Sequence, residues 1–535
     1  MAPGRPAGGG APLTGTAVLL RFVVRRDMAR MLAWVGGFVL LAALSAASVK
    51  GLYPTQADLD EAAAAARDNV AAIAFNGPAV GLDTVGGQVA FNLGAFGLVM
   101  MGLMSLLMVG RLTRGEEETG RLEMLRALPV GARAPTAAAV LAVGLMNVVA
   151  GGAVTACLVV LALPVAGSVT FGASFVLFGL LLSAIAMAVA ETTENTRVVY
   201  GSTGAVLAAA FVLRAIGDTG DGTVSWLSPI GWAQKARPYA GDRWWPFGLL
   251  VAATVAVAAL AGRLGARRDY GAGLVAPRPG RANATRHLRG TLGLAVRLQR
   301  GSLVGWGLGT VVMAVAYGAI APSIDQFVRT NQALADMFAA GGGSLTDAYL
   351  ATSAQVLALI GTGYALQSVL RLRSEEASLH AEALLATPTS RLRWALSHLA
   401  LAFGGVLVLL ALTGVTLGAS YSLAGGPPGA TYRALATLVL YAPAVWVMAG
   451  LGVALVGLAR RATIGAWLAL SVCLVIGFVG PLLRLPQWAL DLSPFTHVPR
   501  LPGEGPRLLP VLLLIATASA LTAAGLAGLR HRDVG

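Results

Sequence analysis

Residues 93–129 read LGAFGLVMMGLMSLLMVGRLTRGEEETGRLEMLRALP, an apolar run without a charged residue followed by a stretch that mixes acids and bases. About 20 consecutive apolar residues in a helix cross the roughly 30 Å hydrocarbon core of a bilayer. Residues 93–110 therefore predict a membrane-spanning helix, and residues 111–129 predict the loop that leaves the membrane.

Comparable apolar runs recur along the whole chain. It has 535 residues, of which 56% are hydrophobic and 12% are charged, about half the charged fraction of an ordinary soluble protein. The runs lie near residues 31–49, 93–110, 137–163, 169–190, 199–216, 247–264, 302–320, 351–370, 397–422, 433–458, 464–483 and 508–529. The sequence therefore predicts an all-α polytopic membrane protein of about twelve transmembrane helices.

The distribution of positive charge predicts the orientation. The net charge of +14 comes mostly from arginine, because Lys50 and Lys235 are the only lysines. With the N-terminus inside, the cytoplasmic segments carry a clear excess of basic over acidic residues, as the positive-inside rule requires. We expect a multi-pass protein of the bacterial plasma membrane with both termini in the cytoplasm. The basic residues form clusters between spans rather than a basic face, which argues against a nucleic-acid partner.

Four sequence patterns occur twice in the same order, which indicates a duplicated chain. They are Trp34-x-x-Gly37 and Trp306-x-x-Gly309, the acidic loops after the second and eighth runs, Leu-Ser-Pro at 227–229 and 492–494, and Arg-Asp-x-Gly at 268–271 and 532–535. We expect two parallel six-helix repeats. The expected organisation is a cytoplasmic lead with an amphipathic connecting helix at 1–30, a first transmembrane half at 31–264, a basic cytoplasmic linker at 265–300 and a second transmembrane half at 301–535.

The loop at 111–135 and its second copy at 371–393 carry more acids than a cytoplasmic loop usually does. In each copy acids crowd the first turn of a short predicted helix, where the helix dipole favours them, and a proline follows the helix. The residues are Glu116, Glu117, Glu118, Glu123 and Leu125 in the first copy and Glu375, Glu376, Glu382 and Leu384 in the second. A charged amphipathic helix presented twice to the cytosol is typical of a docking surface. A solvated loop helix stabilised by its own Glu–Arg pairs gives the same pattern, so both interpretations stay open.

The first of these loops resembles the coupling-helix motif of type-2 ABC exporter permeases. Residues 117–123 read EETGRLE, with an acidic pair before Gly120 and a Glu-x-Leu segment after it, and Pro129 follows. The whole chain resembles the fused twelve-span permeases of polyketide-antibiotic and multidrug export, the tetronasin type. The second loop departs from the motif, with Leu379 in place of the glycine and His380 in place of the arginine. The resemblance implies ATP-driven export, and the departure implies weaker or asymmetric coupling in the second half.

No nucleotide-binding motif accompanies this resemblance. A P-loop requires Gly-x-x-x-x-Gly-Lys-Ser/Thr, and neither Lys50 nor Lys235 follows a glycine. The resemblance therefore implies a separate ATP-binding subunit that holds ATP and magnesium, in two copies, one for each coupling helix. We expect no catalytic residue, cofactor or metal site in this chain, because Cys157 and Cys473 lie in apolar runs without metal-ligand spacing.

Residues 16–31 predict a helix that precedes the first span. Its apolar side chains face one way, and Arg21, Arg25, Arg26 and Arg30 form a basic face. Such a helix lies flat in the membrane interface. In the resembled family this connecting helix also contacts the ATPase, whereas a lipid anchor alone explains the pattern equally well.

Two arginines and the two Leu-Ser-Pro segments mark the outer side. Arg214 and Arg484 lie near the outer ends of the fifth and eleventh runs, where long basic side chains snorkel to the surface. An outer gate is the alternative role for them. It would also include Trp226, Pro229 and Pro494, which an aromatic belt or a re-entrant helix would otherwise explain.

The interiors of the predicted spans hold almost no charged residues. This composition favours a hydrophobic or amphipathic small molecule as cargo, carried between the two halves. The alternative function is an ion-coupled secondary transporter of twelve spans. Such carriers usually hold carboxylates at membrane depth, whereas Glu191 and Glu194 are placed at a cytoplasmic end by the sequence.

Overall fold

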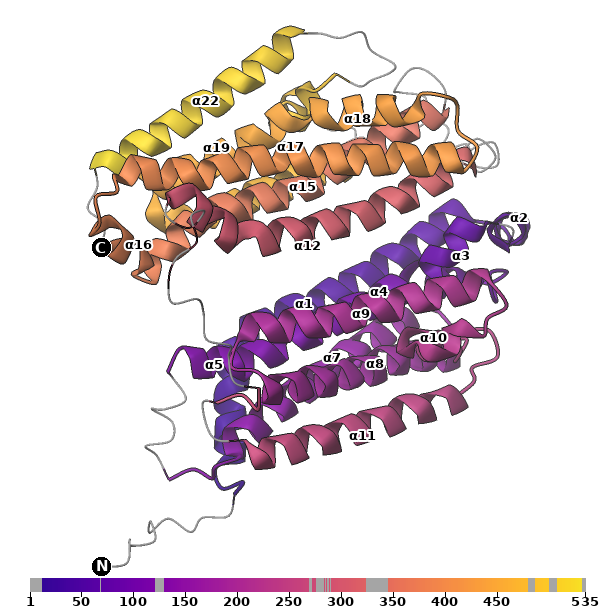
Figure 1. Ribbon diagram of the computed structural model, residues 1–535. Helices are drawn as coiled ribbons and strands as arrows, with labels where there is room; N and C mark the ends of the chain where they lie inside the picture. The colour runs from indigo at the N-terminus through magenta and orange to yellow at the C-terminus, as the bar shows by residue number, and fades with distance from the viewer. Residues whose placement is uncertain are drawn as a thin grey trace, which may run out of the picture. The chain divides into compact units, whose positions relative to one another are not determined.

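The computed structural model describes residues 12–67, 69–120, 129–268, 272–275, 283, 285, 288, 290–323, 345–479, 486–499 and 508–531. These residues form helices joined by short turns, with no β-strand among them (Figure 1). The chain divides into two compact units, Met1–Gly280 and Arg281–Gly535, which are described separately below.

The first unit contains six long helices and several short ones. The long helices are α1 (Thr16–Leu52), α4 (Val85–Leu112), α7 (Ala134–Val160), α8 (Val165–Thr192), α9 (Thr196–Thr219) and α11 (Trp245–Arg267). The short ones are α2 (Gln56–Arg67), α3 (Val70–Asn76), α5 (Arg114–Glu118), η1 (Val224–Leu227) and α10 (Pro229–Gln234).

Within the first unit α4 and α8 are the most buried spans, and α11 and α1 are the most exposed. Small residues allow the inner helices to approach closely, as is usual in membrane proteins. A Cβ on Gly97 of α4 would meet the ring of Phe175 on α8, and one on Gly151 of α7 would lie 2.7 Å from the Gly172 carbonyl oxygen of α8. The core is therefore built around α4 and α8.

The second unit repeats the same order of long helices. They are α12 (Thr291–Ile320), α15 (Leu345–Ala377), α17 (Arg391–Leu423), α18 (Ala430–Leu440) continued by α19 (Ala442–Leu458), α20 (Gly465–Val479) and α22 (Leu508–His531). Between them lie η3 (Ala321–Ser323), α16 (His380–Leu385), η4 (Arg460–Ala462), α21 (Gln487–Leu490) and η5 (Pro494–His497). Here too the second and fourth spans, α15 and α18–α19, are the most buried.

The expectation of an all-α polytopic membrane protein is confirmed. Each of the twelve apolar runs falls on a helix, and eleven helical stretches in the described residues are long and apolar enough to cross a membrane. The run at 464–483 coincides with α20, which is apolar but shorter, and residues 480–485 lie outside the described part. A total of twelve spans therefore stays a prediction.

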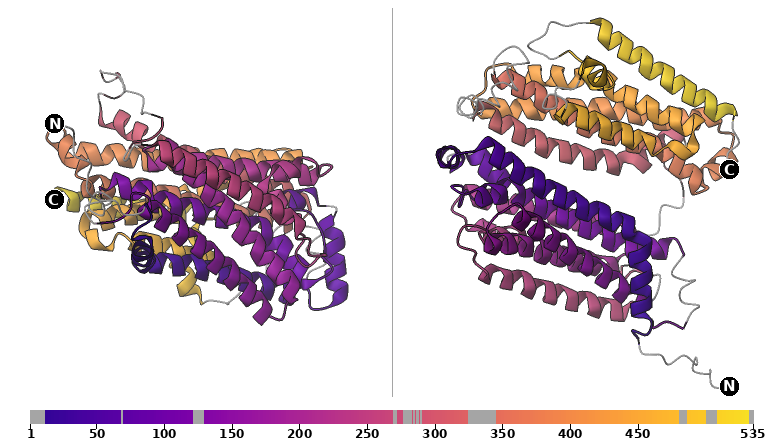
Figure 2. Two further views of the ribbon diagram at one scale, coloured as in Figure 1. Left: turned by 90° about the horizontal axis from the view of Figure 1, so that it is seen from below. Right: turned by 180° about the vertical axis from the view of Figure 1, so that it is seen from behind.

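The first helix differs from the expected pair of elements. The sequence predicts a separate interfacial helix at 16–31, whereas α1 continues for 37 residues. At 1.5 Å per residue this helix is about 55 Å long, far more than the roughly 30 Å hydrocarbon core requires. The right-hand view of Figure 2 shows the start of α1 running across the ends of neighbouring helices before the helix turns along them.

Candidate functional site

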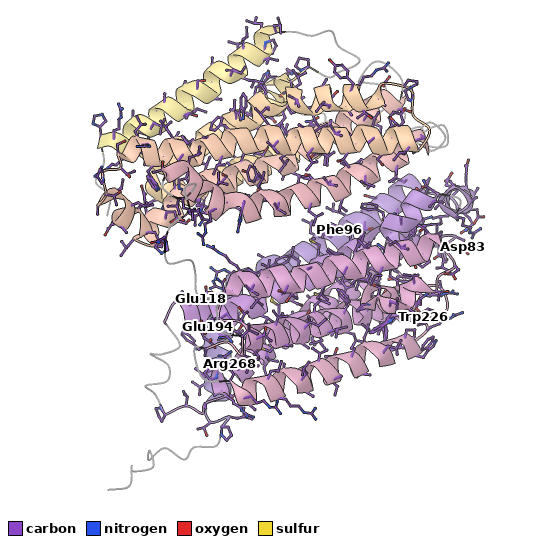
Figure 3. All side chains as sticks on the ribbon, viewed as in Figure 1. Asp83, Phe96, Glu118, Glu194, Trp226 and Arg268 are labelled. Carbon is purple, nitrogen blue, oxygen red and sulfur yellow. The ribbon has the colours of Figure 1, made fainter. Side chains whose placement is uncertain are left out.

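The short helix α5 and its acids lie at one end of the first unit. Figure 3 shows Glu118, Glu194 and Arg268 at this end, and Asp83 and Trp226 at the opposite end of the same unit. α5 follows α4 after a single residue, Thr113, so that the second span leads directly into it. We call this region the α5 end.

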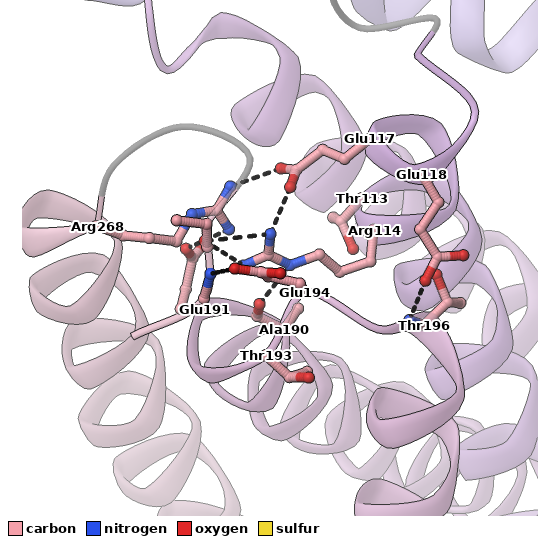
Figure 4. Close-up of polar contacts among 12 residues, drawn as sticks. Thr113, Arg114, Glu117, Glu118, Ala190, Glu191, Thr193, Glu194, Thr196 and Arg268 are labelled. Atoms are coloured by element: carbon pink, nitrogen blue, oxygen red, sulfur yellow. Dashed lines mark hydrogen bonds and ion pairs between the residues drawn. The ribbon is translucent and has the colours of Figure 1, made fainter. Parts of the chain in front are cut away.

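An ion-pair network joins α5 to the ends of α8 and α11 (Figure 4). Arg114 of α5 is fully buried, donates to the Ala190 carbonyl oxygen at 2.6 Å and pairs with Glu117. Arg268, just after α11, lies 2.6 Å from Glu117 and 2.9 Å from Glu191. Two guanidinium groups and two carboxylates thus neutralise one another. Removing one member of such a buried group costs about 3–5 kcal/mol, because its partner stays charged and unpaired.

Two further acids receive backbone N–H groups at the same end. Glu118 accepts from the Thr196 N–H at 2.6 Å, at the first residue of α9, where the helix dipole favours an anion. Glu194, in the turn between α8 and α9, accepts from the Gly273 N–H at 3.1 Å. These bonds attach both α5 and the segment after α11 to the α8–α9 turn.

The connecting part of α1 is held by a carboxylate that the sequence analysis missed. Asp27 is fully buried, and its two oxygens accept from Arg26 at 3.0 and 3.1 Å, from Arg30 at 2.5 Å and from Arg111 of α4 at 2.9 and 3.1 Å. Arg26 also lies 3.0 Å from Glu116 of α5, which is buried. The available signal was an isolated acid within a run of arginines at helical spacing.

The remaining arginines of the connecting part are exposed. Arg21 and Arg25 lie on the surface, as the basic face predicts. Leu19 is buried, whereas Val18 and Phe22 remain exposed, so the predicted apolar face packs only partly within the unit. This exposed apolar surface beside exposed arginines fits either of the two expected roles, the lipid anchor or the ATPase contact.

The second copy of the acidic loop has simpler contacts. Glu375 is buried and lies 2.9 Å from Arg371, one turn earlier on α15, and 3.5 Å from the His380 ring. Glu376 is also buried. Glu382 is exposed on α16, and Leu384 packs against the core of the second unit.

Both acidic loops contain a residue in the left-handed conformation, Gly120 two residues after α5 and Leu379 directly before α16. Gly120 has φ +68° and Leu379 has φ +61°, although an L residue with a side chain rarely adopts this conformation. The turn thus persists where the sequence departs from the glycine. Of the predicted coupling residues, Glu123 and Leu125 lie outside the described residues.

At the opposite end, Arg214 does not snorkel as expected. It is fully buried, donates to the carbonyl oxygens of Ile73 at 3.4 Å and Phe75 at 2.9 Å, and lies over the Phe211 ring. The expectation of a surface arginine was wrong because α3 folds back over α9 and presents its C-terminal carbonyl groups to the guanidinium. Arg484 lies outside the described residues.

The two Leu-Ser-Pro segments adopt similar local structures, the first opening an α-helix and the second a 3-10 helix. In each, the serine hydroxyl accepts a backbone N–H, from Gly231 to Ser228 and from Phe495 to Ser493, and the proline takes the first helical position. Pro229 opens α10 and Pro494 opens η5. Proline suits this position because its missing N–H has no partner there anyway.

Aromatic side chains line the same end of the first unit. Trp226 stacks on Trp245 with ring centroids 5.3 Å apart, and the Lys235 ammonium lies 4.6 Å from the Trp226 ring centre. Tyr239 wedges between Gly86 and Gly167, and its hydroxyl lies 2.9 Å from the Ser168 hydroxyl. Burial raises the pKa of Tyr239 to about 12. These contacts fasten the α10 segment onto α4 and α8.

Comparison with known proteins places this architecture in a family. The chain is 38% identical over 542 aligned residues to the multidrug efflux system permease protein Rv1217c of Mycobacterium tuberculosis, covering 99% of this chain and 98% of the relative. The chain belongs to the family of multidrug efflux system permeases. The family model of the Rv1217c C-terminal domain matches residues 288–530 of this permease, which lie within the second unit.

The α5 end of the first unit of this permease carries a cluster of buried ion pairs. Sequence reasoning found Glu116, Glu117 and Glu118 and allowed for local Glu–Arg pairs such as Arg114–Glu117. It missed the distant partners Arg26, Arg268 and Thr196. Among the described residues, no three His, Cys, Asp or Glu side chains come together in a way that could hold a metal ion.

Proposed function

We propose that this permease is the membrane subunit of an ATP-driven ABC exporter for hydrophobic or amphipathic compounds, in multidrug or antibiotic efflux. As a permease it is a transporter subunit rather than an enzyme. ATP and magnesium are held by a separate ATP-binding subunit, in two copies. The chain spans the plasma membrane with both termini in the cytoplasm, and the α5 end faces the cytoplasm. The relative is named as a multidrug efflux permease, which supports the cargo class.

The observation that supports coupling is the set of bonds made by the five residues of α5. They reach α1 through Glu116 and Arg26, α8 through Arg114 and Ala190, α9 through Glu118 and Thr196, and the end of α11 through Glu117 and Arg268. A force applied to α5 by a nucleotide-dependent partner would therefore reach four spans through polar contacts and α4 through the chain itself.

If the partner docked on the acids of α5, those carboxylates would have to be accessible to it. A free docking surface needs exposed carboxylates, whereas Glu116 is buried and Glu117 is engaged with two arginines. We propose that α5 serves as the lever that transmits motion, and that the ATP-binding subunit touches its exposed side together with Arg21 and Arg25. In the second unit, exposed Glu382 on α16 takes the docking role.

The experiment is a co-purification followed by transport. The chain is expressed with the ATP-binding protein encoded beside it, purified in mild detergent and reconstituted in liposomes. We expect a complex with two ATP-binding subunits per chain, and dye export that stops when the P-loop lysine of the partner is replaced. A chain that moves the dye alone, without ATP and under an ion gradient, would instead establish the secondary transporter.

A further inference from the structure

A cavity of about 690 Å³ lies in the first unit and reaches the Glu117–Arg268 pair of the α5 end at one of its ends. α7 and α11 form its two sides, and α8, against which both helices pack, forms its floor. Binding sites for drug-sized molecules have volumes of about 300–1,000 Å³. We call this cavity the α7–α11 groove.

Two glycines keep the groove open. Nothing lies within 4 Å of a Cβ built on Gly262 of α11, and a Cβ on Gly144 of α7 would only touch Leu180 at 3.7 Å. The neighbouring side chains Leu141 of α7 and Val255 of α11 are large, apolar and exposed. In a membrane-spanning helix such side chains face lipid, so the groove is accessible sideways from the bilayer.

One end of the groove is charged. Glu117, Glu191 and Arg268 line it there, and both carboxylates are engaged by arginines. Arg133, at the start of α7, also lines the groove, is exposed and makes no ion pair with any described residue. Arg114 also pairs with Glu117. This end of the groove therefore holds three guanidinium groups and two carboxylates, those of Arg114, Arg133, Arg268, Glu117 and Glu191. The surplus positive charge suits an anionic group on a molecule whose apolar part lies along α7 and α11.

The sixth span of the second unit is arranged differently. α22 packs on α19 and also contacts α17. A Cβ on Gly457 of α19 would lie 2.0 Å from the Gly525 carbonyl oxygen of α22, so the two backbones are in direct contact. In the first unit, by contrast, Gly262 faces open space. The opening beside α11 is thus a feature of the first unit and not a necessary result of the repeated fold.

We infer that the α7–α11 groove is a loading site for cargo that enters from the membrane, and that its ligand is an amphiphile with a single anionic group. The anion lies at Arg133 and the apolar body along Gly144 and Gly262. The volume fits one drug-sized molecule. The inference that this ligand is cargo rests on the proposed export function, whereas the inference of binding does not.

The test labels the full chain, with its ATP-binding partner, in liposomes. The probe is a diazirine derivative of palmitic acid, used at alkaline pH so that its carboxyl group is ionised, and labelled residues are located by peptide mass spectrometry. We expect label on α7, α8 and α11. Gly262→Leu and Gly144→Leu should each lower it about fivefold or more, because the new side chains fill the groove. Gly248→Leu on α11 and Gly152→Leu on α7 are matched controls, since both glycines face open space outside the groove.

The charge is tested separately. Arg133→Gln should lower labelling about tenfold, the equivalent of about 1.4 kcal/mol, whereas Arg263→Gln, an exposed arginine of α11 outside the groove, should leave it unchanged. A diazirine alkylamine of equal chain length should label the groove less. Equal labelling by the amine, or label spread evenly over the exposed helices, would overturn the proposed site.

Transport of a fluorescent fatty acid decides whether the ligand is cargo. Gly262→Leu should lower ATP-driven transport together with labelling, with Gly248→Leu unchanged. Loss of labelling with transport intact would overturn the loading role. Labelling needs no ATP hydrolysis, so specific labelling in a chain without ATP-driven transport would contradict the proposed function and leave the binding site standing.

Discussion

Replacement of Asp27 by asparagine should loosen α1 from the rest of the first unit. The carboxylate is fully buried and receives five N–H groups from Arg26, Arg30 and Arg111. Asparagine has similar size but no charge, and its NH₂ group would face these donors. Among the described residues, Glu116 would then be the one carboxylate left in an ion pair with this group of arginines, through Arg26.

The magnitude follows from burial. Breaking a buried ion pair by removing one partner costs about 3–5 kcal/mol. Side chains of Arg30 and Arg111 are 56% and 32% exposed, so both can recover some hydration, and the lower end of this range applies. For a unit of this size about 3 kcal/mol corresponds to a fall of about 6–12 °C in the unfolding temperature.

A thiol-reactive dye measures each unit separately, because each carries one cysteine. Cys157 on α7 lies 3.8 Å from the Val39 carbonyl oxygen of α1, so it reports the contact that Asp27 helps to hold. Cys473 on α20 is buried in the second unit. We expect Asp27→Asn to lower the temperature at which Cys157 reacts in a Cys473→Ser background.

The matched control is Glu61→Gln, which removes an exposed acid from α2 and should change the transition by less than about 1 °C. Adding Arg111→Gln to Asp27→Asn should cost less than the sum of the two changes, because it removes a cation left unpaired. An unchanged Cys157 transition, or an equal fall for Cys473 in a Cys157→Ser background, would refute the assignment of Asp27 as the anchor of α1.

Three further predictions concern the second copy and the opposite end. Leu379→Gly should raise the temperature at which Cys473 reacts by about 1–3 °C. Relief of the left-handed conformation of a residue with a side chain gains about 1–2 kcal/mol, which exceeds the cost of about 0.5–1 kcal/mol from the greater entropy of the unfolded chain. Leu379→Ala keeps the strained conformation and should show no gain. Glu382→Lys should leave both cysteine transitions unchanged and reduce co-purification of the ATP-binding subunit several-fold, whereas the same change at Glu61 should not; full retention of the subunit would argue against docking at α16. Arg214→Lys should speed amide hydrogen exchange in α3 about tenfold or more, because a lysine cannot reach both carbonyl groups, and unchanged exchange would show that α3 is held by other contacts.

The membrane spans could be predicted from sequence because the bilayer imposes a local condition on each one. A run such as 93–110 needs only its own composition to be recognised, and it fell on α4. The continuity of α1 was also open to prediction, since no proline interrupts residues 16–52 and the only glycines are Gly36, Gly37 and, in the last turn, Gly51. The prediction of an interfacial helix at residues 16–31 did not include this continuity, because it was based on amphipathicity and did not consider helix-breaking residues.

The local pairs Arg114–Glu117 and Arg371–Glu375 were open to prediction from helical spacing. The contacts between distant elements could not be predicted, because they depend on where those elements meet. The loop acids were identified as a group, yet a pattern of charges does not distinguish Glu117, engaged by two arginines, from Glu382, which is exposed. Arg268 reaches Glu117 across 151 positions of the chain. Arg214 was assigned to the surface because snorkelling needs no partner, whereas its burial depends on α3, a helix from a segment that hydropathy alone leaves undefined.

The two units differ at one matching position of the sequence pattern Trp-x-x-Gly. Asp27 precedes Trp34 by seven residues, and Gln299 precedes Trp306 by the same seven, so both have the same place relative to this pattern. Gln299 is buried like Asp27, but it is neutral and contacts Ser368 and His398. The first unit thus fixes its connecting helix with charges that continue into α5, and the second fixes it with a neutral hydrogen-bond cluster. Displacing α5 from α1 would separate buried charges and is costly, whereas the neutral cluster of α12 imposes no such charge-separation cost. Under the proposed coupling to two ATP-binding subunits, α1 and α5 of the first unit would therefore move together, whereas α12 of the second unit would shift more easily.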